Sequence, residues 1–523
     1  MKYPKSILIP SLLLGAVSCG QSEPNSGSTP PGPPGPPGPP DPPISSTEPN
    51  VILFLADDMG YGDVSGLNPD SKIRTRNLDA MCSNGIAFTD AHASSALSTP
   101  SRYSILTGRY PWRTALKSGV RNGYGNPLIA AERSTIADMF TGAGYATACI
   151  GKWHLGWNWN GGNSQGSADY TKPISRGPVD HGFQYFYGIA ASLDMPPYIY
   201  LENNSVVQVP TVTMPARTGV ELMREGPAGA DFVPEEVLPT LLGKSLEYIV
   251  GRKGKEDPFF LYIPITGPHT PILPSKEFQG KSIIGVYGDF VLQIDDMIGQ
   301  IVAKLKETDQ YDNTIIMFTT DNGCASYIGV KNMEAMGHYP SYVYRGYKTD
   351  AFEGGHRIPL IVSWGDRLTA RQDNSPVSLT DFYATFTDMT GSTLQDNEAE
   401  DSFSFWPVVE SGGRGERQSI VATSGEGYFT YTKNYLKLIF WAGSGGDSSP
   451  TASQVSGLPE MQLYDLLKDP GEKTNLINDP DYADEVSEMT ADMRKILTDG
   501  RSTPGTVQSN DTSNDWKQTV LFR

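Results

Sequence analysis

Residues 50–58 read Asn50-Val51-Ile52-Leu53-Phe54-Leu55-Ala56-Asp57-Asp58, an apolar run that ends in two aspartates. An unbroken run such as 51–55, without alternating polar residues, is typical of a strand buried on both faces of a parallel sheet. Similar runs lie at 145–150, 259–263, 314–319 and 358–363. Segments of helical length lie between and after them, at 134–142 with Ser134 as the N-cap, 236–252, 284–308 and 379–390. This alternation predicts an α/β fold with a large mixed, mostly parallel sheet sandwiched by helices.

A second, smaller unit is expected after the sheet. Around 396–415 the composition becomes polar and glycine-rich, and beyond it the runs 427–432 and 435–441 flank Lys433-Asn434 as in a β-hairpin. We therefore expect a main domain over 49–395 and a smaller C-terminal α+β subdomain over 396–523.

The charge balance excludes one class of partner. The chain has 523 residues with 41 basic and 59 acidic side chains, a formal charge of −18. Nucleic-acid binders need a basic surface for phosphate contacts, so this balance argues against nucleic acid as a partner. A small anionic substrate would need a local cluster of cations inside a chain whose overall field repels it.

The first 48 residues have the composition of an export signal and a linker. Lys2 and Lys5 precede an apolar stretch that is too short to span a membrane, and Cys19 follows small residues as in a bacterial lipobox. We expect a cleaved signal peptide at 1–19 with lipidation of Cys19, then a proline- and glycine-rich tether over 20–48. The expected product is an exported bacterial lipoprotein of the outer membrane, cell surface or periplasm, with an ordinary signal peptide, or a Cys19 without a role, as the alternatives.

The remaining cysteines, Cys82, Cys149 and Cys324, are odd in number and do not suggest a disulfide framework. Buried free thiols are expected, with a bridge between Cys82 and Cys149 as the alternative.

Polar side chains follow four of the predicted strands at the point where each strand ends. They are Asp57-Asp58, Lys152 with His154, His269, and Asp321-Asn322. Ligands of open α/β sheets bind beyond the carboxyl ends of the strands, so we expect these four groups to converge on one site.

Two of the groups suggest a metal. Asp57, Asp58 and Asp321 would repel one another if gathered without neutralisation, whereas a hard divalent cation with oxygen ligands, including Asn322, removes that repulsion. Calcium or magnesium is implied. The alternative is that each pair only caps a helix or makes a turn, and the presence of matching pairs at two strand ends disfavours it.

The cationic candidates are Arg102, Lys152, His154, His269 and Lys348. Any one alone is more often a surface or structural group. Beside strand ends and a candidate metal site, together they suggest a clamp for a tetrahedral oxyanion such as a sulfate or phosphate ester.

The segment Ser98-Thr99-Pro100-Ser101-Arg102 offers a nucleophile at the start of a helix. Pro100 suits the first helical turn, which places Ser98 just ahead of a helix whose free amides and dipole favour an anion. Arg102 lies one turn further on. A simple N-cap is the alternative role of Ser98.

This segment, followed by Thr107-Gly108-Arg109-Tyr110-Pro111, resembles the signature of formylglycine-dependent type I sulfatases, members of the alkaline phosphatase superfamily. The similarity runs from about residue 49 to 490. It includes 50–63, 151–156, 267–269, 320–323, Lys348, 353–359, 463–466 and 469–472. The resemblance implies an alkaline phosphatase-like fold and makes 49–395 the catalytic domain.

The resemblance implies a role for each candidate. Asp57, Asp58, Asp321 and Asn322 would hold calcium together with an oxygen of residue 98. Ser98 would be oxidised to formylglycine and hydrated, so that one oxygen attacks sulfur and the other drives sulfate release. His154 would take the proton, Arg102 and Lys152 would orient and neutralise the diol, and His269 with Lys348 would bind sulfate and protonate the departing sugar oxygen.

Serine at position 98, where many sulfatases have cysteine, resembles the serine-type subtype matured by an iron–sulfur radical enzyme, which would be a transient partner. There are two alternatives. The serine replaces a cysteine in order to trap substrate, or the chain is a natural, unmodified relative that binds its ligand without hydrolysing it. The expected substrates are sulfated polysaccharide or oligosaccharide fragments. A phosphoester or phosphonate hydrolase and a non-catalytic sulfoglycan-binding lipoprotein remain the other candidate functions.

The segment 176–204 is expected near the pocket mouth, where its aromatic residues either present planes to a sugar or pack under a loop. His356 and Arg357 either face the site or pack at the start of the next strand.

Overall fold

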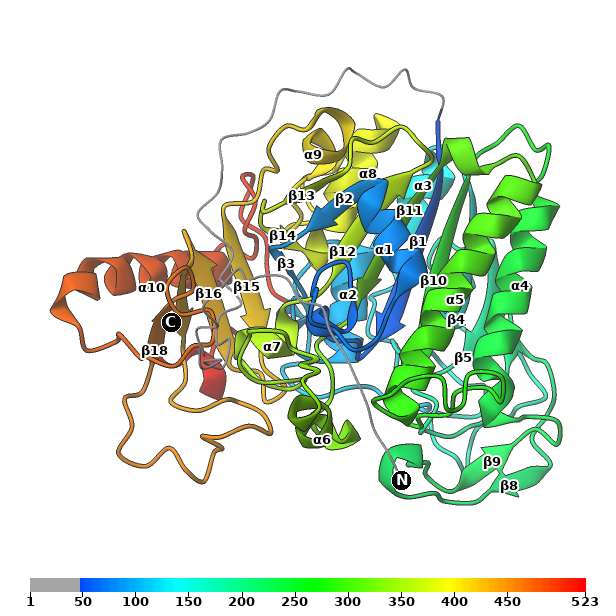
Figure 1. Ribbon diagram of the computed structural model, residues 1–523, viewed down its shortest axis with the longest axis horizontal. Coiled ribbons are helices and arrows are strands. Elements are labelled where there is room, and N and C mark those ends of the chain that lie inside the picture. The colour runs from blue at the N-terminus through cyan, green and yellow to red at the C-terminus, as the bar shows by residue number, and fades with distance from the viewer. Residues whose placement is uncertain (1–47) are drawn as a thin grey trace, which may run out of the picture.

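The computed structural model describes residues 48–523, and a ten-stranded mixed sheet forms the centre of its larger unit (Figure 1). Five central strands are parallel neighbours. In spatial order they are β11 (Thr314–Thr320), β1 (Asn50–Asp57), β10 (Phe259–Pro268), β4 (Ala146–Lys152) and β5 (Tyr185–Ile189). The predicted mostly parallel sheet is therefore confirmed.

Shorter strands extend both edges of this parallel centre, and all but one of their pairings are antiparallel. Beside β11, β12 (Leu360–Trp364) runs antiparallel both to β11 and to β2 (Gly85–Phe88), and β13 (Arg371–Asp373), which is parallel to β2, ends that edge. The short strands β6 (Leu201–Glu202) and β7 (Ser205–Val206) end the other edge.

Helices cover both faces of the sheet, which explains the unbroken apolar run of β1. Ile52 and Phe54 point into the core under α1 (Arg76–Ser83), α4 (Val237–Gly251) and α5 (Val286–Glu307). Val51, Leu53 and Leu55 point into the opposite core, under the helices α2 (Ser98–Thr107), α3 (Ile136–Gly142), α8 (Phe382–Thr390) and α9 (Trp406–Ser411). Because successive strand residues face opposite sides, both sets must be apolar.

A four-stranded antiparallel sheet with one long helix forms the C-terminal subdomain, seen at the left of Figure 1. Its elements are β15 (Ser419–Thr423), β16 (Phe429–Lys433), β17 (Leu436–Ile439), β18 (Gln462–Asp465) and α10 (Ala483–Thr498). The predicted hairpin is present. Its turn lies one residue later than expected, at Asn434-Tyr435, whose φ angles of 50° and 63° suit a type I′ turn.

Shorter elements complete the chain: β3 (Ala91–His92), β14 (Val377–Ser378), β8 (Val212–Met214), β9 (Gly226–Ala228), α6 (Val330–Ala335) and α7 (Glu353–His356). The core of the larger unit also includes residues beyond the predicted boundary at 396, namely Phe405, Trp406, Val408 and Val409.

The position of the domain boundary itself stays a prediction.

Some predicted boundaries were wrong. The helix expected from Ser134 begins at Ile136, because Thr135 is its N-cap and accepts hydrogen bonds from the amides of Ala137 and Asp138. The Ser134 hydroxyl instead contacts the Tyr383 hydroxyl at 2.7 Å. Strand β10 continues five residues past its predicted end, and β12 begins at Leu360.

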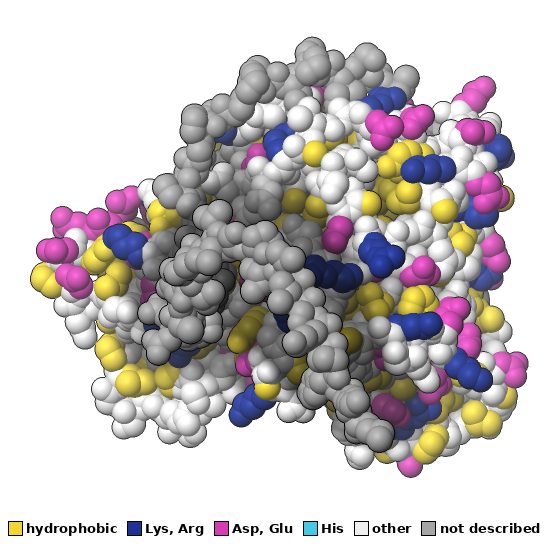
Figure 2. All heavy atoms as spheres, viewed as in Figure 1, with side chains coloured by type: hydrophobic (Ala, Val, Ile, Leu, Met, Phe, Trp, Pro, Cys, Tyr) yellow, Lys and Arg dark blue, Asp and Glu magenta, His cyan; other side chains and the backbone are white. Residues whose placement is uncertain are grey.

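The predicted signal peptide, Cys19 and almost all of the tether lie outside the described residues. Within residues 48–523, no helix is both long enough and apolar enough to cross a membrane. Cys82, Cys149 and Cys324 are free, so the alternative bridge between Cys82 and Cys149 is wrong. The expected buried free thiols are confirmed for Cys149 and Cys324, whereas Cys82 is only partly buried. On the face drawn in Figure 2, side chains of both charges are interspersed, and acidic ones gather around the end of α10.

Candidate active site

The carboxyl ends of β1 and β11 bring the two predicted acidic pairs into contact. Asp57 is the last residue of β1, and Asp58 follows it with a left-handed φ of 65°. The Asp58 amide donates to Asp321 Oδ1 at 3.1 Å, and Asn322 Nδ2 donates to Asp58 Oδ1 at 2.7 Å. All four side chains are buried. A left-handed aspartate is costly, and its presence here shows that the surrounding contacts hold Asp58 toward the site.

Helix α2 brings Ser98 and Arg102 to these carboxylates. Ser98 is the first residue of α2 and Leu97 is the N-cap, so both the placement of Ser98 ahead of the helix and its alternative role as a cap were wrong. The Ser98 hydroxyl donates to Asp57 Oδ1 at 3.1 Å and lies 3.5 Å from Asn322 Oδ1. Arg102 donates to Asp321 Oδ2 from Nε at 3.1 Å and from Nη2 at 2.8 Å. Arg102 thus binds a carboxylate, not Ser98, in this structure.

Strand β4 ends in Lys152, whose ammonium is fully buried. Lys152 Nζ donates to Asp57 Oδ2 at 2.6 Å and to Ser192 Oγ at 2.7 Å. Burial lowers the pKa of Lys152, and the carboxylate of Asp57 opposes that shift. Ser192 was not among the sequence candidates, and its position seven residues after the start of β5 carries no motif that would have identified it.

His154 is held in one tautomer. Its Nε2 lies 2.7 Å from the carbonyl oxygen of Arg121. A carbonyl can only accept, so Nε2 carries the proton and Nδ1 keeps its lone pair. Within the described residues, the buried Nδ1 has no hydrogen-bond partner. Burial, with the charges of Lys152 and Arg102, holds the pKa of His154 well below its usual value, so the ring is neutral near pH 7.

His269 and Lys348 approach the second carboxylate oxygen of Asp58, Oδ2, while Asn322 contacts Oδ1. Lys348 Nζ donates to Asp58 Oδ2 at 2.7 Å, and His269 Nε2 lies 3.7 Å from the same oxygen. His269 Nδ1 donates to the Thr270 carbonyl. Burial lowers the pKa of Lys348, but the charges of Asp58, Tyr327 and Asp57 together outweigh this effect and raise the pKa overall. The structure therefore brings the predicted site residues together, and all of them except the partly exposed Lys348 are buried.

The donor set fits a hard divalent cation. Carboxylate oxygens of Asp57, Asp58 and Asp321 all lie within 4.8 Å of one another. Burial, and after it the neighbouring Asp57, raise the pKa of Asp321, while Arg102 and Lys152 oppose that shift. Burial also raises the pKa of Asp57, but Lys152, His269 and Arg102 outweigh it and lower the pKa overall. A set of gathered carboxylate and amide oxygens is what calcium or magnesium binds.

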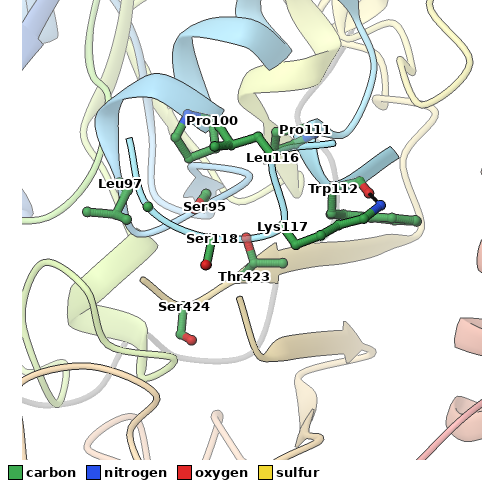
Figure 3. Close-up of a pocket in the computed structure, with 11 residues that line it drawn as sticks. Ser95, Leu97, Pro100, Pro111, Trp112, Leu116, Lys117, Ser118, Thr423 and Ser424 are labelled. Carbon is green, nitrogen blue, oxygen red and sulfur yellow. Dashed lines mark hydrogen bonds between the residues drawn. The ribbon is translucent and has the colours of Figure 1, made fainter. Parts of the chain in front are cut away.

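The C-terminal subdomain contacts the segments on both sides of this cluster. The Ala96 amide donates to the Thr423 carbonyl at 2.8 Å, and the Gly425 amide donates to the Thr349 carbonyl at 2.7 Å. Figure 3 shows the small pocket at this junction, where the hydroxyls of Ser95, Ser118, Thr423 and Ser424 lie close to the start of α2. The subdomain thus supports the positions of Ser98 and Lys348.

Two open interpretations are now decided. His356 and Arg357 pack away from the cluster: His356 Nδ1 lies 3.1 Å from His92 Nδ1, and Arg357 contacts Glu353 at 3.1 Å. In the segment 176–204, Phe183 and Tyr198 are each 1% exposed, so these aromatic rings pack under the loop.

The chain is similar to known proteins over most of its length. A protein-family model described as Sulfatase matches residues 49–392. An N-acetylgalactosamine-6-O-sulfatase of Bacteroides thetaiotaomicron is 32% identical over 483 residues, covering 85% of this chain and 93% of that protein. An N-acetylgalactosamine-6-sulfatase of Sus scrofa is 29% identical and covers 84% of each chain. A solved structure from work on glycosaminoglycan metabolism by B. thetaiotaomicron has a TM-score of 0.77 and 30% identity, covering 86% of this chain and 99% of that one.

Proposed function

Since the chain belongs to the sulfatase family and is a sulfuric ester hydrolase, we propose that it removes sulfate from glycans, in particular from 6-sulfated N-acetylgalactosamine in glycosaminoglycans. Similarity to named N-acetylgalactosamine-6-sulfatases over 84% or more of the chain supports the choice of sugar. One observation carries the mechanism: Ser98 Oγ lies 3.1 Å from Asp57 within a buried cluster of carboxylates and cations.

Two groups would complete this site. Calcium would be held by oxygens of Asp57, Asp58, Asp321, Asn322 and residue 98, and would supply positive charge beside the sulfate oxygens. Ser98, oxidised to formylglycine and hydrated, would supply the attacking oxygen and a route to expel sulfate.

His154 is the proposed proton acceptor at residue 98. Its neutral Nδ1 has no partner among the described residues, and the Arg121 carbonyl keeps Nε2 protonated. A base with a fixed tautomer needs no reorientation before it accepts a proton. The low pKa of His154 keeps that lone pair available well into the acidic range.

Lys152, Lys348 and His269 form the proposed oxyanion clamp. Lys152 lies on the Asp57 side and Lys348 with His269 on the Asp58 side. Positive groups fixed on two sides of an ester sulfur stabilise the charge that develops as the bond to the sugar oxygen breaks. One of His269 and Lys348 then protonates that oxygen.

Peptide mass spectrometry tests whether the nucleophile is mature. The Ser98 peptide should be lighter by two hydrogens in protein made with an iron–sulfur radical maturase, the proposed transient partner. An unmodified Ser98 in an active enzyme would refute the proposed nucleophile. If Ser98 is unmodified and sulfated glycans bind without losing sulfate, the chain is a non-catalytic binding protein.

A panel of defined sulfated oligosaccharides tests the substrate class. We expect sulfate release from 6-sulfated N-acetylgalactosamine, and His269→Ala should reduce turnover strongly. Nitrophenyl sulfate and nitrophenyl phosphate separate the two hydrolase classes, because a phosphoester or phosphonate hydrolase would prefer the phosphate.

The proposed location is that of an exported lipoprotein. It rests on the lysines, apolar stretch and Cys19 of the sequence. Metabolic labelling with an alkyne fatty acid should modify the wild-type chain and not Cys19→Ala. Equal labelling of both chains would refute the anchor.

A further inference from the structure

A half-exposed arginine beside the active site has unused hydrogen-bond donors. The Arg224 side chain is 53% exposed, and its Nη1 donates to the carboxylate of Asp194. Across residues 48–523, Asp194 is its single acidic contact, and Nε and Nη2 have no hydrogen-bond partner. These two nitrogens can therefore bind a ligand.

Asp194 fixes the position of this arginine relative to the sulfate site. Asp194 is 4% exposed, and its carbonyl accepts from the Arg224 amide at 3.0 Å and from the Tyr198 hydroxyl at 3.1 Å. It lies two residues after Ser192, whose hydroxyl contacts Lys152 Nζ at 2.7 Å. Arg224 is thus tied through main chain and side chain to the segment that contacts the oxyanion clamp.

Tyr327 presents an aromatic surface beside the same site. It is 51% exposed, and its hydroxyl lies 2.9 Å from Thr270 Oγ1, next to His269. The contact with Thr270 places Tyr327 beside the clamp residue His269. Burial raises the pKa of the Tyr327 phenol, and the charges of Lys348, Asp58 and Asp194 also act on it. In Figure 1, α6, which follows Tyr327 directly, and the strands β8 and β9 on either side of Arg224 lie on the lower side of the molecule. An exposed ring with polar groups around it suits contact with one face of a sugar.

We propose that Arg224, positioned by Asp194, binds an anionic group on the sugar next to the sulfated one, and that Tyr327 packs against that sugar. This inference rests on the proposed function and extends it to a second sugar. The anionic group is the carboxylate of a uronic acid or a second sulfate ester, since each offers paired oxygens to a guanidinium. The subsite would make the enzyme prefer acidic oligosaccharides to neutral ones.

The test compares Arg224→Gln with the wild type on three 6-sulfated disaccharides. They carry a uronic carboxylate, the same group reduced to a hydroxymethyl, or a second sulfate in place of the carboxylate. Loss of one charged hydrogen-bonded contact corresponds to about a 10- to 100-fold fall in affinity. We expect a fall in kcat/KM of this size, mainly through KM, on the carboxylate substrate, the second-sulfate substrate or both, and a much smaller fall on the reduced one. The larger of the two losses identifies the anion.

Asp194→Asn should produce the same pattern with a smaller loss, because it weakens the hold on Arg224 and leaves the guanidinium in place. Arg217→Gln is the matched control, since Arg217 lies on the same segment but pairs with Glu235 at 2.8 Å. Equal losses on acidic and reduced substrates, or no loss on any, would overturn the proposal.

A binding measurement separates this proposal from the proposed function. The affinity of the unsulfated uronic disaccharide, measured by calorimetry, requires no turnover. If the protein releases no sulfate but Arg224→Gln still weakens this binding by about 10-fold or more, the subsite stands and the hydrolase does not.

Discussion

Lys437 provides a direct test of how the C-terminal subdomain is joined to the catalytic unit. The side chain is fully buried on β17. Its Nζ lies 3.0 Å from Glu353 Oε1 in α7 and 2.9 Å from Glu472 Oε1. Glu353 follows Lys348 by five residues, so this ion cluster anchors the segment that carries one of the clamp residues.

Lys437→Met keeps a chain of similar length and removes the ammonium. In this variant Glu353 keeps its ion pair with Arg357, whose Nη1 lies 3.1 Å from Glu353 Oε2. Among the described residues, the Glu472 carboxylate keeps only the hydrogen bond that its Oε2 accepts from the Glu353 amide at 2.7 Å. Removal of one partner from a buried ion pair costs about 3–5 kcal/mol. Burial, together with the charge of Glu353, already raises the pKa of Glu472 to about 7. Glu472 can therefore take up a proton when Lys437 is lost, which places the expected cost near the lower end, about 3 kcal/mol at pH 7.

Urea unfolding followed by tryptophan fluorescence measures this cost. Lys433→Met is the matched control, because Lys433 lies on the neighbouring strand and pairs with Glu488 and Asp492 at the surface. Its loss should lower the free energy of unfolding by at most about 1 kcal/mol. The double variant Lys437→Met with Glu472→Gln should recover about half of the loss, since it leaves no buried charge without a partner. A Lys437→Met protein within about 1 kcal/mol of the wild type, or a double variant no more stable than the single one, would refute this account.

Three further outcomes are expected. His154→Asn should lower kcat on nitrophenyl sulfate by about 10²- to 10⁴-fold with a smaller change in KM, and a loss confined to KM would contradict its role as proton acceptor. Removal of divalent ions by chelation should abolish sulfate release and lower the melting temperature, with recovery on addition of calcium, whereas full activity after chelation would exclude the metal. Burial raises the pKa of Asp295 from 3.8 to about 6, so between these values the folded chain holds a proton that the unfolded chain lacks. This contribution to stability is lost as pH rises, so from pH 5 to pH 7 the free energy of unfolding of the wild type should fall by about 1 kcal/mol relative to Asp295→Asn, and parallel pH profiles would contradict it.

The sequence was sufficient to predict the sheet and the location of the site. An apolar run such as 51–55 has few structural alternatives, because both faces of the strand must be covered. The carboxyl ends of parallel strands share one edge, so Asp57 and Asp321 could be placed together although they are 264 residues apart. These are consequences of strand geometry and need no knowledge of individual contacts.

Other parts of the site depend on contacts that have no sequence pattern. The tautomer of His154 is set by the main-chain carbonyl of Arg121, to which any residue at that position would contribute equally. Ser192 reaches Lys152 because β5 is the parallel neighbour of β4, with Ile189 paired to Lys152, and the loop after β5 begins beside it. The N-cap was assigned to Ser134 and not to Thr135 because both residues can cap, and the Tyr383 hydroxyl that engages Ser134 comes from a distant helix.

The charges of the site also bear on how an anionic ester can enter an acidic protein. Arg102, Lys152 and Lys348 are each bound to a carboxylate, to Asp321, Asp57 and Asp58 respectively. Three cations therefore face three anions, and the cluster by itself has little net attraction for sulfate. A divalent cation on the same carboxylates would draw part of their charge away from the lysines and leave their ammonium groups available to the substrate. The cation would then act in two ways: its own charge would attract the sulfate, and it would free Lys152 and Lys348 from Asp57 and Asp58. This would give a reason for placing the clamp lysines on the same carboxylates that would bind the metal.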